Sequence, residues 1–311
     1  MIFRYHHLRH HASVFLAVTG LQLNEFDQLV NDLLPSYGEA EQERLERPER
    51  QRAIGGGRDF ALDARDQILL TVVWLRKYPT QEVLGYLYGL SDTSAGRVVK
   101  RVLPLLEQAG RDTMRMPDPG RKRRQSLPDL LADTPEIAVV IDTFEQRIQR
   151  HKDRDTADEH YSGKKRQNTL KSQVAVNEFN GLFIDVADSV PGPTADIKVL
   201  EHSDLLNRLP EGVGAIGDLA YIGIDQLHPD GLAAAPRRKP RGKPRPEADI
   251  AYNTEFSRRR IIVENSIGRL RRYEAVNQTD RHHRQMHTER VVAIAGLVNR
   301  QILPRFPSSV A

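Results

Sequence analysis

The sequence predicts an all-helical N-terminal region followed by an α/β region with a mixed β-sheet. Three observations carry this prediction. Up to about residue 111, apolar residues recur at helical spacing, whereas from residue 137 short apolar strands alternate with helices. Between the two, residues 112–136 are rich in proline and charge and lack apolar periodicity. We therefore expect a helical domain over 1–111, a linker over 112–136 and an α/β domain over 137–311.

The composition limits the class of protein. A chain of 311 residues with 39 % hydrophobic content is enough for a buried core. No apolar run reaches the length of a membrane span, and the start "MIFRYHHLRHH" lacks the apolar core of a signal peptide. The formal net charge is only +4, yet basic residues gather at 121–124, 163–171, 237–245 and 258–273. Such runs on a nearly neutral chain suggest a polyanionic partner, although each run alone could be solvated surface.

The absence of cysteine excludes disulfides, thiol catalysis and cysteine-ligated zinc. A metal ion would need carboxylates or histidines, and carboxylates suit hard ions such as Mg²⁺. Histidines gather at 6–11 and 282–287, but no predicted strand or helix fixes them. We expect these histidines to be surface residues.

Two amphipathic helices are expected in the first part of the helical region. The segment "LNEFDQLVNDLLPSY" is expected to end at Pro35, and "ARDQILLTVVWLRKY" is the more buried of the two. Between them lies Gly55–Gly57. These glycines could let backbone approach a phosphate, but the plainer interpretation is a loop, because a phosphate cradle follows a strand and precedes a helix.

Residues 80–106, "TQEVLGYLYGLSDTSAGRVVKRVLPLL", have the pattern of a helix-turn-helix. A first helix of about eight residues, a turn around Leu90 to Asp92 and a second helix capped by Asp92 or Thr93 are expected. The second helix has polar residues suited to a DNA groove and apolar residues suited to packing inward. The expected DNA-binding residues are Arg97, Lys100 and Arg101, and the expected inward residues are Ala95, Val98, Val99 and Val102. An ordinary helical hairpin is the alternative.

In the α/β region, strands are expected at 137–144, 170–178, 181–189, 212–218 and 231–236. Asn180-Gly181 is a strong hairpin signal between the second and third strands. A helix is expected after each of the third, fourth and fifth strands. The order β-β-β-α-β-α-β-α is that of a ribonuclease H-like domain.

Three carboxylates can converge in such a fold. The first and fourth strands lie side by side, so Asp142 and Asp218 are expected at neighbouring strand ends, and Glu264 lies on the last helix, within "RRRIIVENSIGRLRRY". Hard oxygen ligands at these places would suit two Mg²⁺ or Mn²⁺ ions and phosphoryl transfer. For Glu264 the alternative is an ordinary ion pair with Arg260, one helical turn away.

Other acids compete for this site. Asp196 begins a predicted helix, where a capping role is common, and it is kept as a possible fourth metal ligand. Glu145 and Asp185 are expected on the far side of their strands. Asp188 would reach the site only if the third strand were longer than predicted.

The chain resembles bacterial insertion-sequence transposases with a DDE catalytic domain, the group related to eukaryotic Harbinger elements. The matching segments are "RAIGGGRDFAL", the helix-turn-helix, "VIDTFEQRIQR", "YSGKKRQNTLKSQ", "PGPTADIKVL", "GDLAYIG" and "RRRIIVENSIGRLRRY". The resemblance implies the same triad, Asp142, Asp218 and Glu264. Ala220 stands where the family commonly has glycine, and Ala195 where it often has histidine; neither change removes a ligand.

The resemblance implies a DNA transposase that binds terminal inverted repeats and target DNA as a homodimer or higher oligomer, in the cytoplasm on the nucleoid. We expect Lys164 and Lys165, which precede the second strand, and Arg260 and Arg271, beside Glu264, to clamp the DNA backbone near Asp142. Surface ion pairs are the alternative for each. A catalytically silent DNA-binding protein and a plain nuclease of the same fold are the rival functions.

Overall fold

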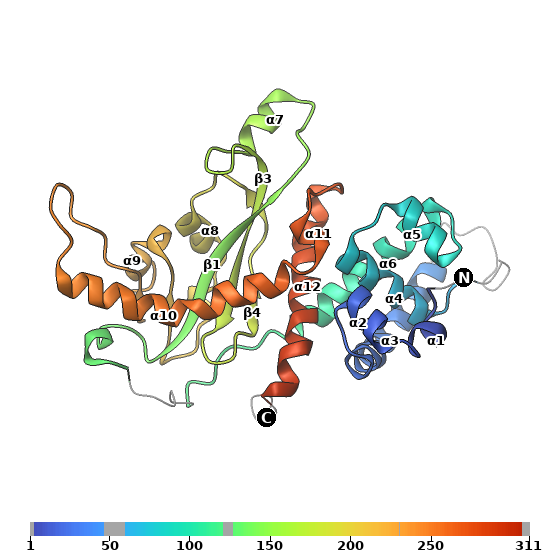
Figure 1. Cartoon of the computed structure of the whole chain (residues 1–311), viewed down its shortest axis with the longest axis horizontal. Coiled ribbons are helices and arrows are strands. Elements are labelled where there is room, and N and C mark those ends of the chain that lie inside the picture. Colours follow the sequence, from blue (N-terminus) through green and yellow to red (C-terminus); the bar gives the residue numbers. More distant parts are fainter. Residues whose placement is uncertain (1–2, 47–59, 121–126, 230, 307–311) are drawn as a thin grey trace.

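A computed structural model of the chain describes residues 3–46, 60–120, 127–229 and 231–306 (Figure 1). A helical region and an α/β region lie side by side, and the C-terminal helix α12 (His287–Ile302) lies between them. Gly55–Gly57 and the basic run 121–124 lie outside the described residues.

Within the described residues the N-terminal region has six helices, which are α1 (Tyr5–Leu8), α2 (Ala12–Thr19), α3 (Leu23–Leu45), α4 (Ala64–Lys77), α5 (Gln81–Tyr88) and α6 (Asp92–Arg111). Pro35 lies inside α3, so the prediction that it ends this helix is wrong. A proline deprives the carbonyl of Asn31 of its helical donor. Beyond Pro35 the helix still has tertiary contacts, since Tyr37 packs against the core and Glu41 lies 3.9 Å from Arg101 of α6.

Helices α5 and α6 form the predicted helix-turn-helix. Thr80 caps α5, and Gly89 ends it in the left-handed conformation with φ 67°. The cap of α6 is Ser91, one residue before the predicted position, and its side chain accepts a hydrogen bond from the Ser94 amide at 3.2 Å. The expected inward residues Ala95, Val98, Val99 and Val102 are all buried.

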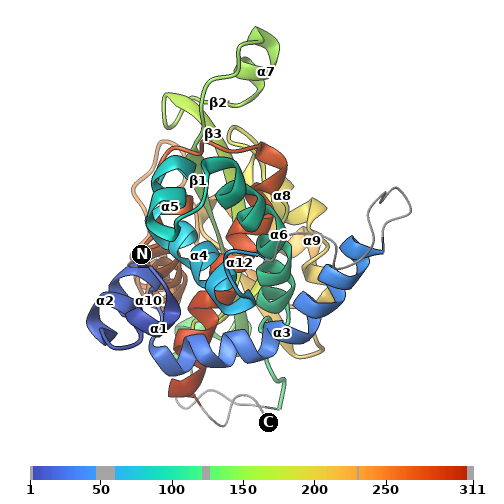
Figure 2. The same ribbon diagram turned by 90° about the vertical axis from the view of Figure 1, so that its right-hand side faces the viewer.

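The two regions share one hydrophobic core. It joins the N-terminal helices to α10 (Glu247–Leu270), α12 and one face of the sheet. Where α6 crosses α12, Gly110 lies against Gly296, and a Cβ on Gly296 would lie 2.2 Å from the Cα of Gly110. This close approach requires glycine, and it fixes α6 against the α/β region (Figure 2).

The α/β region has a sheet of strand order β2-β3-β1-β6-β7, with β4 and β5 also paired to β3. Its strands are β1 (Ile137–Arg147), β2 (Tyr161–Ser162), β3 (Gln167–Asn177), β4 (Phe183–Val186), β5 (Val190–Pro191), β6 (Val213–Ile216) and β7 (Ala233–Ala234). Strand β1 is antiparallel to β3 and parallel to β6. This mixed sheet, with first and fourth predicted strands adjacent, confirms the ribonuclease H-like fold.

The strand boundaries differ from the prediction in three places. The predicted strand 181–189 is reduced to β4, with the separate short strand β5 after it, and the last strand shrinks to two residues. Strands β1 and β3 are longer than expected because they continue as a two-stranded ribbon that carries β2 and α7 (Arg154–Glu159) at its tip (Figure 1). The predicted hairpin after β3 is present, and Gly181 takes φ 72° there.

Helices cover both faces of the sheet. On one face lie α8 (Asp196–His202) and α9 (Ile224–Leu227), over a second apolar cluster, and on the other lie α10 and α12. The short elements are α11 (Glu274–Asn277) and the 3₁₀ helices Asp129–Leu131, Leu206–Arg208, Leu219–Tyr221, Arg284–Met286 and Leu303–Arg305. In the described part of the chain, no helix combines the length and apolar character needed to cross a bilayer.

Helix α10 is anchored by a buried arginine. Arg259 is 5 % exposed and forms an ion pair with Glu178 at 2.7 Å. Its guanidinium also donates to the Thr134 hydroxyl at 2.7 Å and the Pro135 carbonyl at 2.8 Å. Because these partners lie before β1 and after β3, the contacts set where α10 crosses the sheet.

Candidate active site

Asp142 and Asp218 lie on neighbouring strands. Asp142 is in β1, and the parallel register pairs Val140 with Ile216 of β6. Two residues further along each chain are Asp142 and Asp218, which therefore lie side by side on the same face. Asp218 directly follows Gly217 at the end of β6, and its carboxylate accepts a hydrogen bond from the Ala220 amide at 2.8 Å.

Helix α10 brings an arginine to this pair. The Arg260 Nη2 atom lies 3.6 Å from Asp142 Oδ2, and the two side chains are 12 % and 19 % exposed. The Arg260 Nε is buried and, within the described residues, has no hydrogen-bond partner. Arg260 therefore pairs with Asp142 and not with Glu264, which was the alternative drawn from helical spacing.

Glu264 lies on the same face of α10 as Arg260 but is exposed. Arg271, seven residues further on, lies with its guanidinium 5.8 Å from the ring centre of Phe144. Glu264 thus lies on a helical face whose two flanking arginines contact β1 at Asp142 and Phe144. The three residues Asp142, Asp218 and Glu264 come from the elements that the sequence predicted.

Burial raises the pKa of Asp142 from 3.8 to about 6. The Thr143 amide, which donates to Asp142 Oδ1 at 2.8 Å, and the Arg260 guanidinium oppose this rise, whereas Asp218 and Asp196 add to it. The carboxylates of Asp218 and Asp196 are thus close enough to Asp142 to repel its charge. A cluster of carboxylates that repel one another is typical of a cation-binding site.

We expect the Asp142→Asn variant to gain stability relative to the wild type as the pH rises. Because the folded pKa of about 6 exceeds the ordinary value of 3.8, the neutral carboxyl stabilises the fold fully below pH 3.8, and this contribution is lost as the pH rises through 6. A shift of one pKa unit between the unfolded and folded states changes the free energy of unfolding by about 1.4 kcal/mol. Urea denaturation of both proteins in EDTA at pH 4, 6 and 8 measures the change. A difference in unfolding free energy that does not vary with pH would contradict it.

Asp196 does not cap its helix. It is the first residue of α8, after Ala195, and its carboxylate accepts a hydrogen bond from the Lys171 Nζ at 2.6 Å. Lys171 is buried and also donates to the Thr194 carbonyl. The pairing of Lys171 with Asp196 was not predicted from the sequence. The signal for it is a lysine inside the apolar strand β3.

The other acids lie away from Asp142. Glu145 is an odd number of residues along β1, which places it on the opposite face, where it accepts a hydrogen bond from the Thr169 hydroxyl at 2.7 Å. Asp185 forms an ion pair with Arg208 at 2.9 Å. Strand β4 ends at Val186, so Asp188 lies outside it.

The described residues hold no group of three or more histidine, cysteine, aspartate or glutamate side chains close enough to bind a metal ion. The donor set nevertheless fits one. Asp142 and Asp218 offer neighbouring carboxylate oxygens of the kind that hard cations prefer, and their mutual repulsion is one of the causes of the raised pKa of Asp142. Glu264, exposed on α10 one turn beyond Arg260, is the third carboxylate of the predicted set.

The predicted DNA-binding residues divide into two groups. Arg97 and Lys100 are exposed on α6, and Lys164 and Lys165 are exposed in the turn between β2 and β3. Arg101 is only 18 % exposed and lies 3.9 Å from Glu41, with its guanidinium 4.5 Å from the ring centre of Phe60.

Lys164 and Lys165 lie further from Asp142 than we expected. The pairing of β1 with β3 continues to Arg147 opposite Thr169, and both lysines precede Thr169 in the chain. The five residues from Asp142 to Arg147 span about 17 Å of strand. The lysines therefore lie towards the tip of the ribbon, because β3 begins earlier than the sequence predicted.

The second histidine cluster lies only partly at the surface: His283 is exposed, as expected, His282 is half-buried, and His287 contradicts the prediction. His287 is fully buried, with its ring nitrogens 2.7 Å from the Ser189 hydroxyl and 2.8 Å from the Gln146 amide oxygen. Burial lowers its pKa to about 3, so the ring is neutral. Two hydrogen bonds replace the water that this imidazole loses. His6, His7, His10 and His11 are exposed, as expected.

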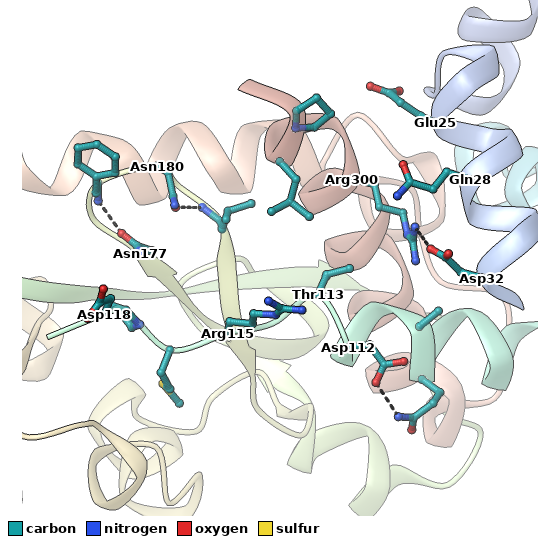
Figure 3. Close-up of a pocket in the computed structure, with 18 of the residues that line it drawn as sticks. Glu25, Gln28, Asp32, Asp112, Thr113, Arg115, Asp118, Asn177, Asn180 and Arg300 are labelled. Atoms are coloured by element: carbon teal, nitrogen blue, oxygen red, sulfur yellow. Dashed lines mark hydrogen bonds and ion pairs between the residues drawn. The ribbon is translucent and has the colours of Figure 1, made fainter. Parts of the chain in front are cut away.

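A large cavity of about 1000 Å³ (Figure 3) is lined by none of Asp142, Asp218 and Glu264. It opens between α3, the linker and the start of β1, and six carboxylates and two arginines line it. Its acidic residues are Glu25, Asp32, Asp112, Asp118, Glu136 and Glu178. This charge repels a phosphate backbone, so the cavity is not a DNA site.

A ribonuclease H-like sheet with paired carboxylates beside a basic helix is an arrangement suited to a metal-dependent nuclease. Residues 141–299 match the family described as DDE superfamily endonuclease, and residues 60–112 match the helix-turn-helix of DDE superfamily endonuclease. The chain belongs to the DDE superfamily of endonucleases. Endonucleases of this superfamily generally use divalent metal ions. The helix-turn-helix prediction is confirmed, and the ordinary hairpin is excluded.

The chain is also similar to a protein described as "Probable transposase for insertion sequence element IS702" from Microchaete diplosiphon. The two are 26 % identical over 291 residues, which cover 94 % of this chain and 95 % of that protein. The similarity therefore extends over both the helical and the α/β regions.

Proposed function

We propose that this endonuclease is a DNA transposase of an insertion sequence, which binds the ends of its element and cuts and joins DNA strands by two-metal-ion phosphoryl transfer. The observation that carries the proposal is the adjacency of Asp142 and Asp218 beneath the arginine side of α10. The full-length similarity to a probable insertion-sequence transposase supports it.

In this proposal Asp142, Asp218 and Glu264 are the catalytic residues and the ligands of Mg²⁺ or Mn²⁺, with Asp196 as a possible fourth ligand. Two bound ions would activate the attacking hydroxyl and stabilise the leaving oxygen. Glu264 would complete the ligand set from α10, where its exposure leaves it free to turn towards β1. Arg260 would exchange its contact with Asp142 for a phosphate oxygen, since a guanidinium suits both anions.

DNA would contact both regions. Arg97 and Lys100 would contact the element end from α6, and Lys164, Lys165 and Arg271 would neutralise backbone phosphates. Arg101 would act through its contacts within the helical region. We assign residues 1–111 to the DNA-binding domain, 112–136 to the linker and 137–311 to the catalytic domain, and we propose a homodimer or higher oligomer on the two ends.

A catalytically silent DNA-binding protein is the alternative. Such a protein would be expected to lose at least one of the three carboxylates, but this chain has all of them. A plain nuclease would need no end recognition, whereas this chain has a helix-turn-helix.

We expect Arg97→Ala and Lys100→Ala to weaken binding to duplexes that carry the ends of the encoding element. Both side chains are exposed on α6, so the fold should not change. A side chain that reads a base should contribute about 1–3 kcal/mol of discrimination, whereas one that contacts phosphate lowers affinity for all sequences. Fluorescence anisotropy with end and scrambled duplexes measures both. Wild-type affinity of both variants for the ends would exclude α6 as the reading helix.

A further inference from the structure

A cleft of about 560 Å³ lies beside the second helix of the helix-turn-helix. Both regions of the chain line it. The helix-turn-helix contributes Pro79, Thr80, Gln81, Gly96, Val99 and Lys100, and the segment before α12 contributes Arg281, His282, His283 and Met286. Two of these residues, Lys100 and Arg281, are permanent cations and none is an acid, so the cleft suits an anion.

Arg281 is held in place at the edge of this cleft. Its guanidinium lies 4.4 Å from the ring centre of Tyr78, at the end of α4, and donates to the Tyr78 carbonyl. The Arg281 amide donates to the Tyr78 hydroxyl at 3.1 Å. The residue is nevertheless exposed. A stacked guanidinium loses little further freedom when it binds an anion.

The neighbouring residues fix this segment to the helical region. Tyr78 donates from its hydroxyl to Asp280 at 3.0 Å, and Asp280 pairs with the fully buried Arg290. His282 packs edge-on against Trp74, with ring centres 5.0 Å apart. Burial, followed by the charge of Arg290, lowers the pKa of His282 to about 4, so the ring is neutral near pH 7. Because Asp280 pairs with Arg290, its negative charge does not offset the positive charge of Arg281.

We propose that Arg281 and Lys100 bind a backbone phosphate of the DNA on which α6 is seated, so that the catalytic region supplies part of the end-recognition surface. When a helix enters the major groove, phosphates lie along both of its sides. Lys100 is on α6, and Arg281 lies across the cleft from it. This proposal rests on α6 being the reading helix. Such a phosphate contact would fix the distance between the recognised DNA sequence and Asp142 and Asp218, because α6 also packs closely on α12.

The test compares Arg281→Gln with wild type in binding to a 30-base-pair end duplex and to a scrambled duplex across a salt series. A phosphate contact is independent of sequence, so both duplexes should lose affinity alike, and the slope of log affinity against log salt should shrink by about 0.9. Arg281→Lys, which keeps the charge, should retain the slope. Lys100→Gln changes an exposed side chain of the same cleft and should reproduce the loss even if Arg281→Gln folds poorly.

Arg111→Gln is the matched control. Arg111 ends α6, is 44 % exposed and pairs with Glu107, away from the cleft. Its salt slope should equal that of the wild type. If Arg281→Gln is folded and keeps the wild-type slope while Arg97→Ala loses end binding, this inference is overturned and the proposed function stands. If the wild type does not prefer the end duplex, the proposed function and this inference both fail.

Discussion

Asp142→Asn, Asp218→Asn and Glu264→Gln are each expected to reduce metal-dependent strand cleavage more than about a hundredfold, the upper end of the loss seen when a residue that only supports a metal ligand is changed. Each change keeps the side-chain volume and removes one anionic oxygen. DNA binding should persist, because α6 belongs to the helical region, whereas these residues lie in or directly after elements of the α/β region. Cleavage of a labelled end duplex in Mg²⁺ or Mn²⁺ measures the effect.

Two further variants make this experiment specific. Glu145→Gln alters a carboxylate three residues along the same strand, on the opposite face, and should leave cleavage nearly unchanged. Asp196→Asn should reduce activity less than the triad variants, because Asp196 is engaged by Lys171. Cleavage that survives in a triad variant would remove that residue from the catalytic set.

The sequence predicted that Asp142 and Asp218 lie side by side, because this placement depends on strand order alone. Each aspartate follows an apolar run, and the order of elements makes the two strands adjacent and parallel. The partner of Arg260 could not be predicted in this way. Helical spacing offers Glu264, one turn away, but α10 lies against β1 and the Asp142 carboxylate competes for the same guanidinium.

The sequence also did not predict that the two regions share one hydrophobic core. The composition of residues 112–136 suggests where the two regions divide in the chain, but composition gives no information on how helices pack. Gly110 and Gly296 are 186 positions apart, and only their contact explains why each lacks a side chain. The same is true of Lys171 and His287, whose polar partners come from distant segments.

Asp280→Ala is expected to destabilise the protein by about 3–5 kcal/mol, the cost of leaving a buried charge without its partner. Arg290 and Asp280 are 0 % and 1 % exposed, and Asp280 also receives hydrogen bonds from the Tyr78 hydroxyl and the His282 amide. Arg290 contacts Asp280 through Nη2, and within the described residues its buried Nε and Nη1 atoms have no hydrogen-bond partner. Urea denaturation followed by circular dichroism measures the change in unfolding free energy.

Two matched variants separate buried charge from contact between the regions. Tyr78→Phe removes the hydroxyl that donates to Asp280 and accepts from the Arg281 amide, and each hydrogen bond lost should cost about 1 kcal/mol. Arg300→Ala breaks an ion pair that joins the two regions, with Asp32 at 2.6 Å, but Asp32 is 46 % exposed, so the loss should be below about 1 kcal/mol. If Asp280→Ala costs no more than Arg300→Ala, the Arg290 charge must be solvated in the native state, and the segment that carries Arg281 is not rigidly fixed to the helix-turn-helix.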